Sequence, residues 1–288
     1  MARVDIEVLS SPTVNHALTH NRVPFLRRVS LAIPATEAPL TATLRLTVLD
    51  PYGQEIARPW SQEVRLEPGE PLVLDDPQLA LDPAIVSTVE EATRTEIRVT
   101  LENATGIVAT SYTPLTLLAA TQWSLDPTTP LQSLRMLAAF VQPNHPAVAE
   151  LLPRVSERLL ATTKSASLGV ENVGPERVDA IVRAVVETVA EQGIAYALPP
   201  ASWGLGQKIR TPGDVLAAHA GTCLDLTLLV AAVLEHLGVA PVVWVAVGHA
   251  FVGWWRGENL GLPDAASLQI MSAVNAVDLE LLGVLEAT

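Results

Sequence analysis

Cys223 and His249 are the residues of this chain whose types and spacing best fit nucleophilic chemistry, and Cys223 is the only cysteine. Thr222 is a good helix N-cap, and Asp225 three residues later completes a capping-box pattern. The pattern predicts Cys223 in the first turn of a helix. Free backbone N–H groups and the helix dipole favour a thiolate there. Asp225, a like charge in the same turn, opposes this effect.

The elements that must position these two residues follow along the chain. Residues 223–237 are mostly apolar or strong helix formers, so we expect a helix buried nearly all round, and Gly238 ends it. Residues 241–247 predict a buried strand, and strand-like sequence flanks His249 on both sides. A cysteine at a helix N-terminus beside a strand-borne histidine suits a cysteine nucleophile, because the imidazole accepts the thiol proton and later protonates the leaving group.

This order of residues resembles a known family. Gly221-Thr222-Cys223-Leu224-Asp225, an apolar helix, a Leu-Gly end, a strand and His249-Ala250-Phe251 are similar to the transglutaminase-like core of the papain-like cysteine enzymes. The resemblance covers residues 211–288. It implies that Cys223 is the nucleophile, that His249 is the general base, and that an acidic residue on the next strand orients the imidazole.

Two acidic residues are candidates for that third role. Glu286 lies in the last predicted strand, residues 281–288, where the family has an aspartate. Asp264 lies in the loop-like Leu262-Pro263-Asp264. Glu286 is favoured because an orienting group belongs on a rigid strand beside the histidine strand, although its side chain is one methylene longer than that of aspartate.

Two further residues are candidates for binding the substrate. Gln207 would donate a hydrogen bond to an oxyanion, as a glutamine ahead of the cysteine does in papain-like enzymes, and Trp203 would line a peptide groove. A surface-loop role for Gln207 and a packing role for Trp203 explain the same residues.

The rest of the chain predicts an α+β multidomain protein. Residues 1–122 should form a β-sandwich, because runs of alternating polarity are separated by turn residues. The runs are Val4–Val8, Thr43–Val48, Glu63–Leu66 and Glu96–Leu101.

Residues 123–288 should form a helical connector followed by the transglutaminase-like domain, with its core at 211–288. Apolar residues recur at helical spacing between residues 130 and 193, which predicts three or four helices. The Pro/Gly-rich segment 195–213 predicts a surface loop.

Composition excludes several function classes. The charge balance is 18 − 31 = −13, which argues against nucleic-acid binding by this segment. Hydrophobic residues make up 49% of the chain, enough for a sizeable core. The single cysteine excludes an internal disulfide framework and a Cys-rich zinc site. We expect no metal site and no cofactor.

The start of the chain lacks a signal-peptide pattern, and no segment suggests a membrane helix, so we expect a cytoplasmic protein.

A second resemblance covers other motifs. Residues 14–18, residues 143–148 and the segment from Pro199 to Arg210 are similar to the N-terminal region of large bacterial helicase-like proteins. That resemblance implies a longer polypeptide with a C-terminal helicase region. No phosphate-binding loop of the Walker type occurs in this segment.

Two functions remain open from the sequence. The first is a cysteine-dependent acyl-transfer enzyme, a peptidase, amidase or transglutaminase-like enzyme acting on a peptide or protein. The second is an inactive transglutaminase-like module that binds a peptide or a partner domain.

Overall fold

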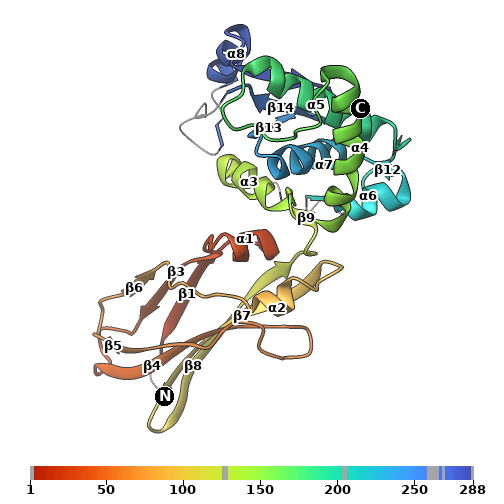
Figure 1. Cartoon of the computed structure of the whole chain (residues 1–288). Helices are drawn as coiled ribbons and strands as arrows, with labels where there is room; N and C mark the ends of the chain where they lie inside the picture. The colour runs from red at the N-terminus through yellow and green to blue at the C-terminus, as the bar shows by residue number, and fades with distance from the viewer. Residues whose placement is uncertain (1–2, 125–128, 203–205, 258–265, 268–269, 287–288) are drawn as a thin grey trace. The chain divides into compact units, whose positions relative to one another are not determined.

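The computed structural model describes residues 3–124, 129–202, 206–257, 266–267 and 270–286. The chain forms two compact units, Met1–Ser124 and Leu125–Thr288 (Figure 1). Both units contain helices and sheets, which confirms the predicted mixed α+β class. None of the helices in the described stretches is both long and apolar enough to cross a membrane.

The first unit contains two sheets whose buried faces share one hydrophobic core. A three-stranded sheet has the order β1-β3-β6, and a five-stranded sheet has the order β2-β8-β7-β4-β5. Alternation along β4 places Leu44, Leu46 and Val48 in the core and leaves Arg45 exposed. The four predicted runs lie in β1, β4, β5 and β7. The elements are β1 Asp5–Ser10, β2 Thr13–Val14, α1 His16–His20, β3 Leu26–Ala32, β4 Leu40–Leu49, β5 Trp60–Leu66, β6 Leu72–Asp75, α2 Pro83–Val86, β7 Thr93–Asn103, β8 Gly106–Leu117 and β9 Gln122–Trp123.

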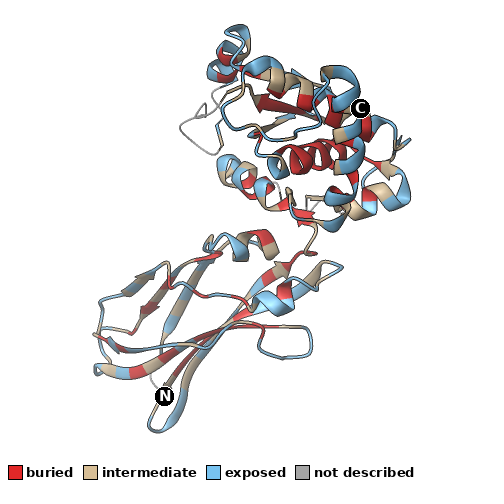
Figure 2. Ribbon diagram, viewed as in Figure 1, coloured by how far each residue is buried: buried red, intermediate tan, exposed pale blue. Residues whose placement is uncertain are grey.

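The second unit packs helices around one central helix. Its helices are α3 Pro130–Leu137, the 3-10 helix η1 Ala138–Phe140, α4 Pro146–Thr163, α5 Pro175–Ala190, α6 Pro212–Ala218, α7 Cys223–His236 and α8 Ile270–Asp278. Part of the helical spacing predicted between residues 130 and 193 is the buried face of α5. In α7, every residue from Cys223 to Leu234 is buried, as predicted (Figure 2).

Short strands complete the second unit. They are β10 Ala195–Tyr196, β11 Gln207–Lys208, β12 Ala220–Gly221, β13 Pro241–Ala246, β14 His249–Trp255 and β15 Leu282–Leu285. The prediction that residues 195–213 are only loop was wrong in part, because β10 pairs in parallel with β12 and α6 begins at Pro212. Backbone pairing with a segment more than twenty residues later leaves no local pattern in the sequence.

An antiparallel sheet of order β13-β14-β15 lies against α7. Its two faces differ. Val252 and Trp254 share the core that contains the α7 residues, and Trp254 Nε1 donates to Asp179 Oδ1 of α5 at 3.0 Å. Side chains alternate along a strand, so His249 and Phe251 lie on the opposite face.

Close packing at Gly283 yields a stability prediction. A Cβ atom at Gly283 would overlap the indole of Trp254, which Asp179 holds in place. We expect Gly283→Ala to destabilise the second unit by about 1–3 kcal/mol, because overpacking forces side chains off their rotamers. Denaturant unfolding measures the change. The matched control is Gly169→Ala, where the nearest atom would be 3.9 Å away. Equal stability of both variants would contradict the packing argument.

Candidate active site

The first turn of α7 has the predicted capping box. Thr222 Oγ1 accepts from the Asp225 backbone N–H at 3.1 Å, and Asp225 Oδ2 accepts from the Thr222 backbone N–H at 2.9 Å. Both residues are buried. Cys223 is therefore the first helical residue, where backbone N–H groups point out of the helix and create a partial positive charge.

Asp225 also receives two hydrogen bonds from Arg210. The Arg210 backbone N–H donates to Oδ1 at 2.8 Å, and its guanidinium Nη1 donates to Oδ2 at 2.8 Å. The Asp225 carboxylate is fully buried, and the Arg210 side chain is 20% exposed. The positive charge of Arg210 compensates the negative charge that the sequence places beside Cys223. Arg210 is thus a residue that sequence reasoning missed, because its contact spans fifteen positions.

Cys223 itself is 9% exposed. Within the described residues, its sulfur makes no hydrogen bond, to His249 or to any other group. The thiol therefore lies at the helix end that favours an anion but is separated from the predicted base.

His249 and Glu286 lie in contact. His249 is the first residue of β14, and its Nε2 lies 2.5 Å from Glu286 Oε2. Both side chains are partly exposed, at 37% and 51%. Strand register explains the pairing: Val252 is opposite Leu285, so Glu286, the next residue, reaches the edge of the sheet beside the start of β14.

Stacked aromatic rings support the imidazole. The His249 ring lies 6.2 Å from the Phe251 ring at 25°, and the Phe251 ring lies 5.5 Å from the Trp244 indole at 10°. These three side chains share the sheet face that points away from α7. They form a continuous row of stacked rings on that face.

Chain direction brings Cys223 and His249 to the same end of the second unit. After α7 the chain turns back and forms β13, which packs on α7, so the end of β13 lies near the start of α7. The next strand, β14, begins there with His249. The hairpin turn is exposed at Val247. The structure therefore joins two of the three predicted catalytic residues directly and places the third at the same end without a hydrogen bond.

Three predicted site residues remain, and the structure describes one of them. Gln207, in β11, donates from Nε2 to Thr222 Oγ1 at 3.5 Å, so its amide lies beside the first turn of α7. Trp203 and Asp264 lie outside the described residues.

Other histidines of the second unit have structural contacts. His219 Nδ1 bonds the Gln192 carbonyl and His236 Nδ1 bonds the Pro143 carbonyl, each at 2.7 Å. His145 Nδ1 accepts from the Ala147 N–H and caps α4. In the described stretches, no group of three or more His, Cys, Asp or Glu side chains is arranged to hold a metal ion.

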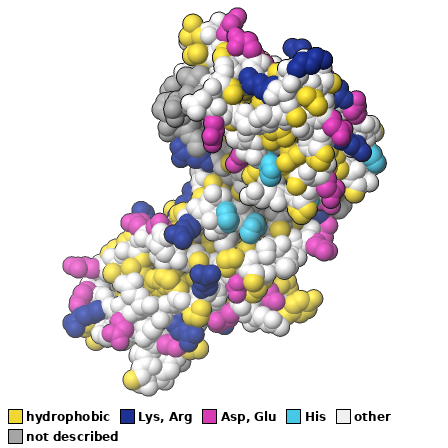
Figure 3. Space-filling model, in the orientation of Figure 1, with side chains coloured by type: hydrophobic (Ala, Val, Ile, Leu, Met, Phe, Trp, Pro, Cys, Tyr) yellow, Lys and Arg dark blue, Asp and Glu magenta, His cyan; other side chains and the backbone are white. Residues whose placement is uncertain are grey.

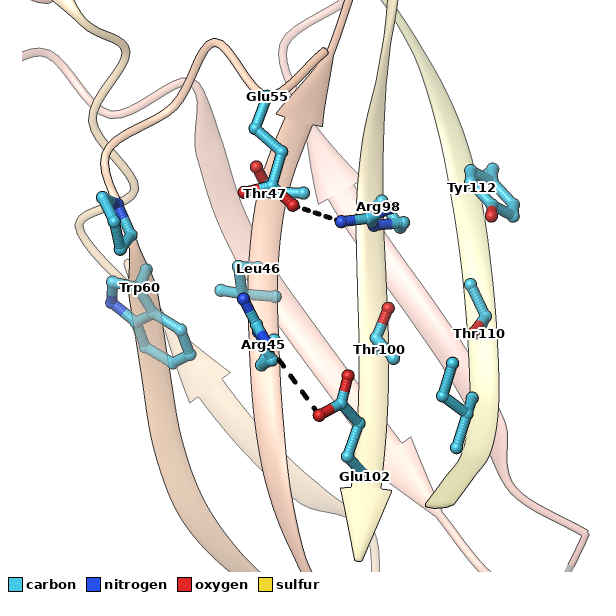
Figure 4. Close-up of a pocket in the computed structure, with 12 residues that line it drawn as sticks. Arg45, Leu46, Thr47, Glu55, Trp60, Arg98, Thr100, Glu102, Thr110 and Tyr112 are labelled. Atoms are coloured by element: carbon cyan, nitrogen blue, oxygen red, sulfur yellow. Dashed lines mark hydrogen bonds and ion pairs between the residues drawn. The ribbon is translucent and has the colours of Figure 1, made fainter. Parts of the chain in front are cut away.

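A pocket in the first unit is a separate candidate. It measures about 260 Å³ and lies on the outward face of the five-stranded sheet (Figure 4). Arg98 pairs with Glu55, and Arg45 Nη1 lies 4.0 Å from Glu102 Oε2. Because each arginine has an acidic partner, the charges of this pocket largely cancel. It contains no cysteine or histidine, so it suggests no nucleophilic chemistry.

Comparisons with known proteins do not show a family. No protein-family model and no curated protein matches the chain. Among solved structures, the chain is similar to a family 76 glycoside hydrolase from a bovine Bacteroides thetaiotaomicron strain (8% identity, TM-score 0.19). That match covers 56% of this chain and 25% of the hydrolase. It is also similar to a putative protease from Parabacteroides distasonis (11% identity, TM-score 0.24), with 87% of this chain and 65% of that protein covered. The chain thus spans less than two thirds of either protein, and likenesses this weak indicate no function.

Proposed function

We propose that the chain is a cysteine-dependent acyl-transfer enzyme, a peptidase, amidase or transglutaminase-like enzyme that acts on a peptide or protein. Cys223 is the nucleophile, His249 is the base and then the acid, and Glu286 orients the imidazole. The observation that carries the proposal is the 2.5 Å contact between His249 Nε2 and Glu286 Oε2, at the end of the unit where α7 presents Cys223.

The contact with the Glu286 carboxylate determines which nitrogen of the His249 ring accepts the thiol proton. Glu286 accepts a hydrogen bond from Nε2, so the neutral ring carries its proton on Nε2 and its lone pair on Nδ1. The same carboxylate stabilises the imidazolium that forms when Nδ1 takes a proton. Within the described residues, Nδ1 has no hydrogen-bond partner, which leaves it open for the thiol proton.

Acyl transfer then proceeds in two stages. The thiol proton moves to Nδ1, and the sulfur attacks the carbonyl carbon to give a tetrahedral oxyanion. The Cys223 backbone N–H and the Gln207 amide stabilise that oxyanion. The carbon–nitrogen bond breaks, the imidazolium protonates the leaving amine, and a thioester remains. Water or a second amine resolves the thioester and frees the enzyme.

The first stage requires the imidazole to approach the sulfur more closely than it does here. Catalytic hydrogen bonds are often long in unliganded enzymes and shorten when substrate binds. His249 is the first residue of β14, and its partly exposed side chain lies on the sheet face away from α7, so the proposal requires the imidazole to swing round the end of the strand towards Cys223.

The order of elements supports the finer architecture that we propose. In the first unit, two sheets share a core as a β-sandwich does. In the second unit, a cysteine helix, a strand, a histidine strand and an acid-bearing strand follow one another, after the helices of the connector. The relation to the N-terminal region of helicase-like proteins, with a C-terminal helicase region as partner, rests on the sequence motifs.

A second function is favoured by one observation. Cys223 is 9% exposed and makes no hydrogen bond to His249. This geometry fits a transglutaminase-like scaffold that has lost catalysis and binds a peptide or a partner domain. The surface formed by His249, Phe251 and Trp244 would then be the binding face.

An acylation assay separates these functions. With p-nitrophenyl acetate, we expect a burst of p-nitrophenolate and one acetyl group on Cys223, detected by mass spectrometry of the intact chain and its peptides. A single cysteine makes the location of a thioester unambiguous. Cys223→Ser is expected to abolish the burst. Acetylation no faster than in urea-unfolded chain would refute the enzyme proposal and favour the binding module.

A further inference from the structure

A second cavity of the first unit has the chemistry of an anion site. It measures about 380 Å³, within the range of about 300–1,000 Å³ that is typical for ligand pockets. Two parts of the chain enclose it. The first is α1 with the segment that follows it, and the second is the segment that leads into α2. Its polar lining includes His16, His20, Arg22 and Arg58, and no Asp or Glu lines it. Figure 3 shows histidine and Lys/Arg side chains close together over the segment that Figure 1 labels α1.

The two arginines of this cavity lack the partners that other arginines have. Within the described residues, neither the Arg22 nor the Arg58 guanidinium makes a hydrogen bond or an ion pair. Elsewhere in the same unit, the pairs Arg28–Asp75, Arg65–Glu67 and Arg98–Glu55 are formed. Two guanidinium groups without acidic partners therefore line one cavity that no carboxylate lines.

Two carboxylates, Asp76 and Asp82, lie close in sequence to residues that line the cavity. Asp82 Oδ1 accepts from the Ala84 N–H and caps α2. Asp76 Oδ2 accepts from the amide of Gln78, a lining residue. Asp76 Oδ1 has no hydrogen-bond partner, but neither carboxylate is among the residues that line the cavity.

His16 contributes an imidazole to the lining of the cavity. Its Nδ1 is buried and has no hydrogen-bond partner. It is one of six buried side-chain atoms without a partner in the described residues, so the proposal rests on the charges that line the cavity and not on this atom. Burial, and secondarily the nearby charge of His20, lower the pKa of His16. The His16 and His20 rings lie 5.8 Å apart, close enough to contact one ligand group together.

The cavity also has an apolar floor. Phe25, Leu79 and Leu81 line it and are at most 5% exposed. A bare inorganic ion would leave this floor unused, whereas a ligand with an apolar body would cover it.

We propose that this cavity binds an organic phosphate monoester, with its phosphate between the two arginines and the two histidines and its apolar part on the floor. A phosphate monoester carries about −1.5 to −2 charges at pH 7 and matches the fork of a guanidinium, so it suits this set of donors better than a single carboxylate does. The site lies within the first unit and is independent of the acyl-transfer chemistry.

Calorimetry with the full chain and phenyl phosphate tests the proposal. We expect saturable binding that Arg22→Gln and Arg58→Gln each weaken about tenfold or more, the usual effect of losing a charge-assisted hydrogen bond. Arg28→Gln is the matched control, since it removes the same charge from an exposed pair with Asp75. Equal weakening by Arg28→Gln, or no saturable binding, would overturn the proposal. Thermal unfolding of each variant checks that the fold is retained.

Two further measurements, with other anions and by NMR, define the ligand class. Benzoate and inorganic phosphate are each expected to bind more weakly than phenyl phosphate, because the first carries less charge and the second lacks the apolar body. Titration followed by NMR should move the ring C–H resonances of His16 and His20 and leave those of His219 and His236 unchanged. Binding of inorganic phosphate as tight as that of phenyl phosphate would refute the role of the floor, and shifts in all histidines would refute the site.

Discussion

Replacing Arg210 with methionine is expected to destabilise the second unit by about 3 kcal/mol. Removal of one partner leaves the other charge buried, and such changes typically cost about 3–5 kcal/mol. The Asp225 carboxylate is fully buried, so it cannot turn to water when Arg210 is lost. The expected value lies at the lower end because the backbone N–H groups of Arg210 and Thr222 still donate to the carboxylate. Urea unfolding of the full chain, with a probe in the second unit, measures the change.

Double replacement shows whether the cost comes from the unpaired charge. Arg210→Met combined with Asp225→Asn removes both charges, so we expect it to recover part of the lost stability despite the weaker cap. Arg158→Met is the control, because its ion pairs with Glu187 and Glu191 lie at the surface and are expected to contribute little. Should the double variant be less stable than Arg210→Met by the full cost of Asp225→Asn alone, Arg210 and Asp225 would be energetically independent and the argument would fail.

Replacing His249 with alanine is expected to slow alkylation of Cys223 by iodoacetamide about tenfold or more at pH 7. Only a few per cent of an unassisted cysteine is thiolate at neutral pH, so a base that takes the proton raises the reactive fraction by up to about thirtyfold. The expected reason is loss of the imidazole that shares the thiol proton. Mass spectrometry of the time course gives the rate.

Two companion variants separate proton transfer from structural damage. Glu286→Gln keeps a hydrogen-bonding group at the same length but removes the carboxylate charge, so we expect a smaller loss of rate than with His249→Ala. His236→Ala is the matched histidine control, because His236 lies at the far end of α7 and bonds the Pro143 carbonyl. Equal alkylation rates in the wild type and His249→Ala at pH 7 would show that the imidazole does not share the thiol proton in the unliganded chain, and the binding-module function would then be preferred.

Several features of the candidate site could be predicted from the sequence because the interactions behind them are local. The capping box joins residues three positions apart, and the mostly apolar helix of fourteen residues is followed by Leu237 and Gly238, so the bounds and burial of α7 follow from short-range patterns. Alternation likewise located β1, β4, β5 and β7. Alternation did not locate β3 or β8. In β8, the outward positions carry Thr, Tyr and Pro rather than charged residues, which obscures the period of two.

The sequence by itself determined that Cys223 stands at the first turn of a capped helix and that His249 and Glu286 belong to strand-like segments later in the chain. Only the tertiary structure decided how these residues lie with respect to one another. Sheet register brought Glu286 to His249, a contact across fifteen positions neutralised Asp225 with Arg210, and the pleat turned the imidazole to the face away from α7. Helix caps depend on neighbours along the chain, whereas register, charge pairing and the choice of face depend on which distant segments pack together.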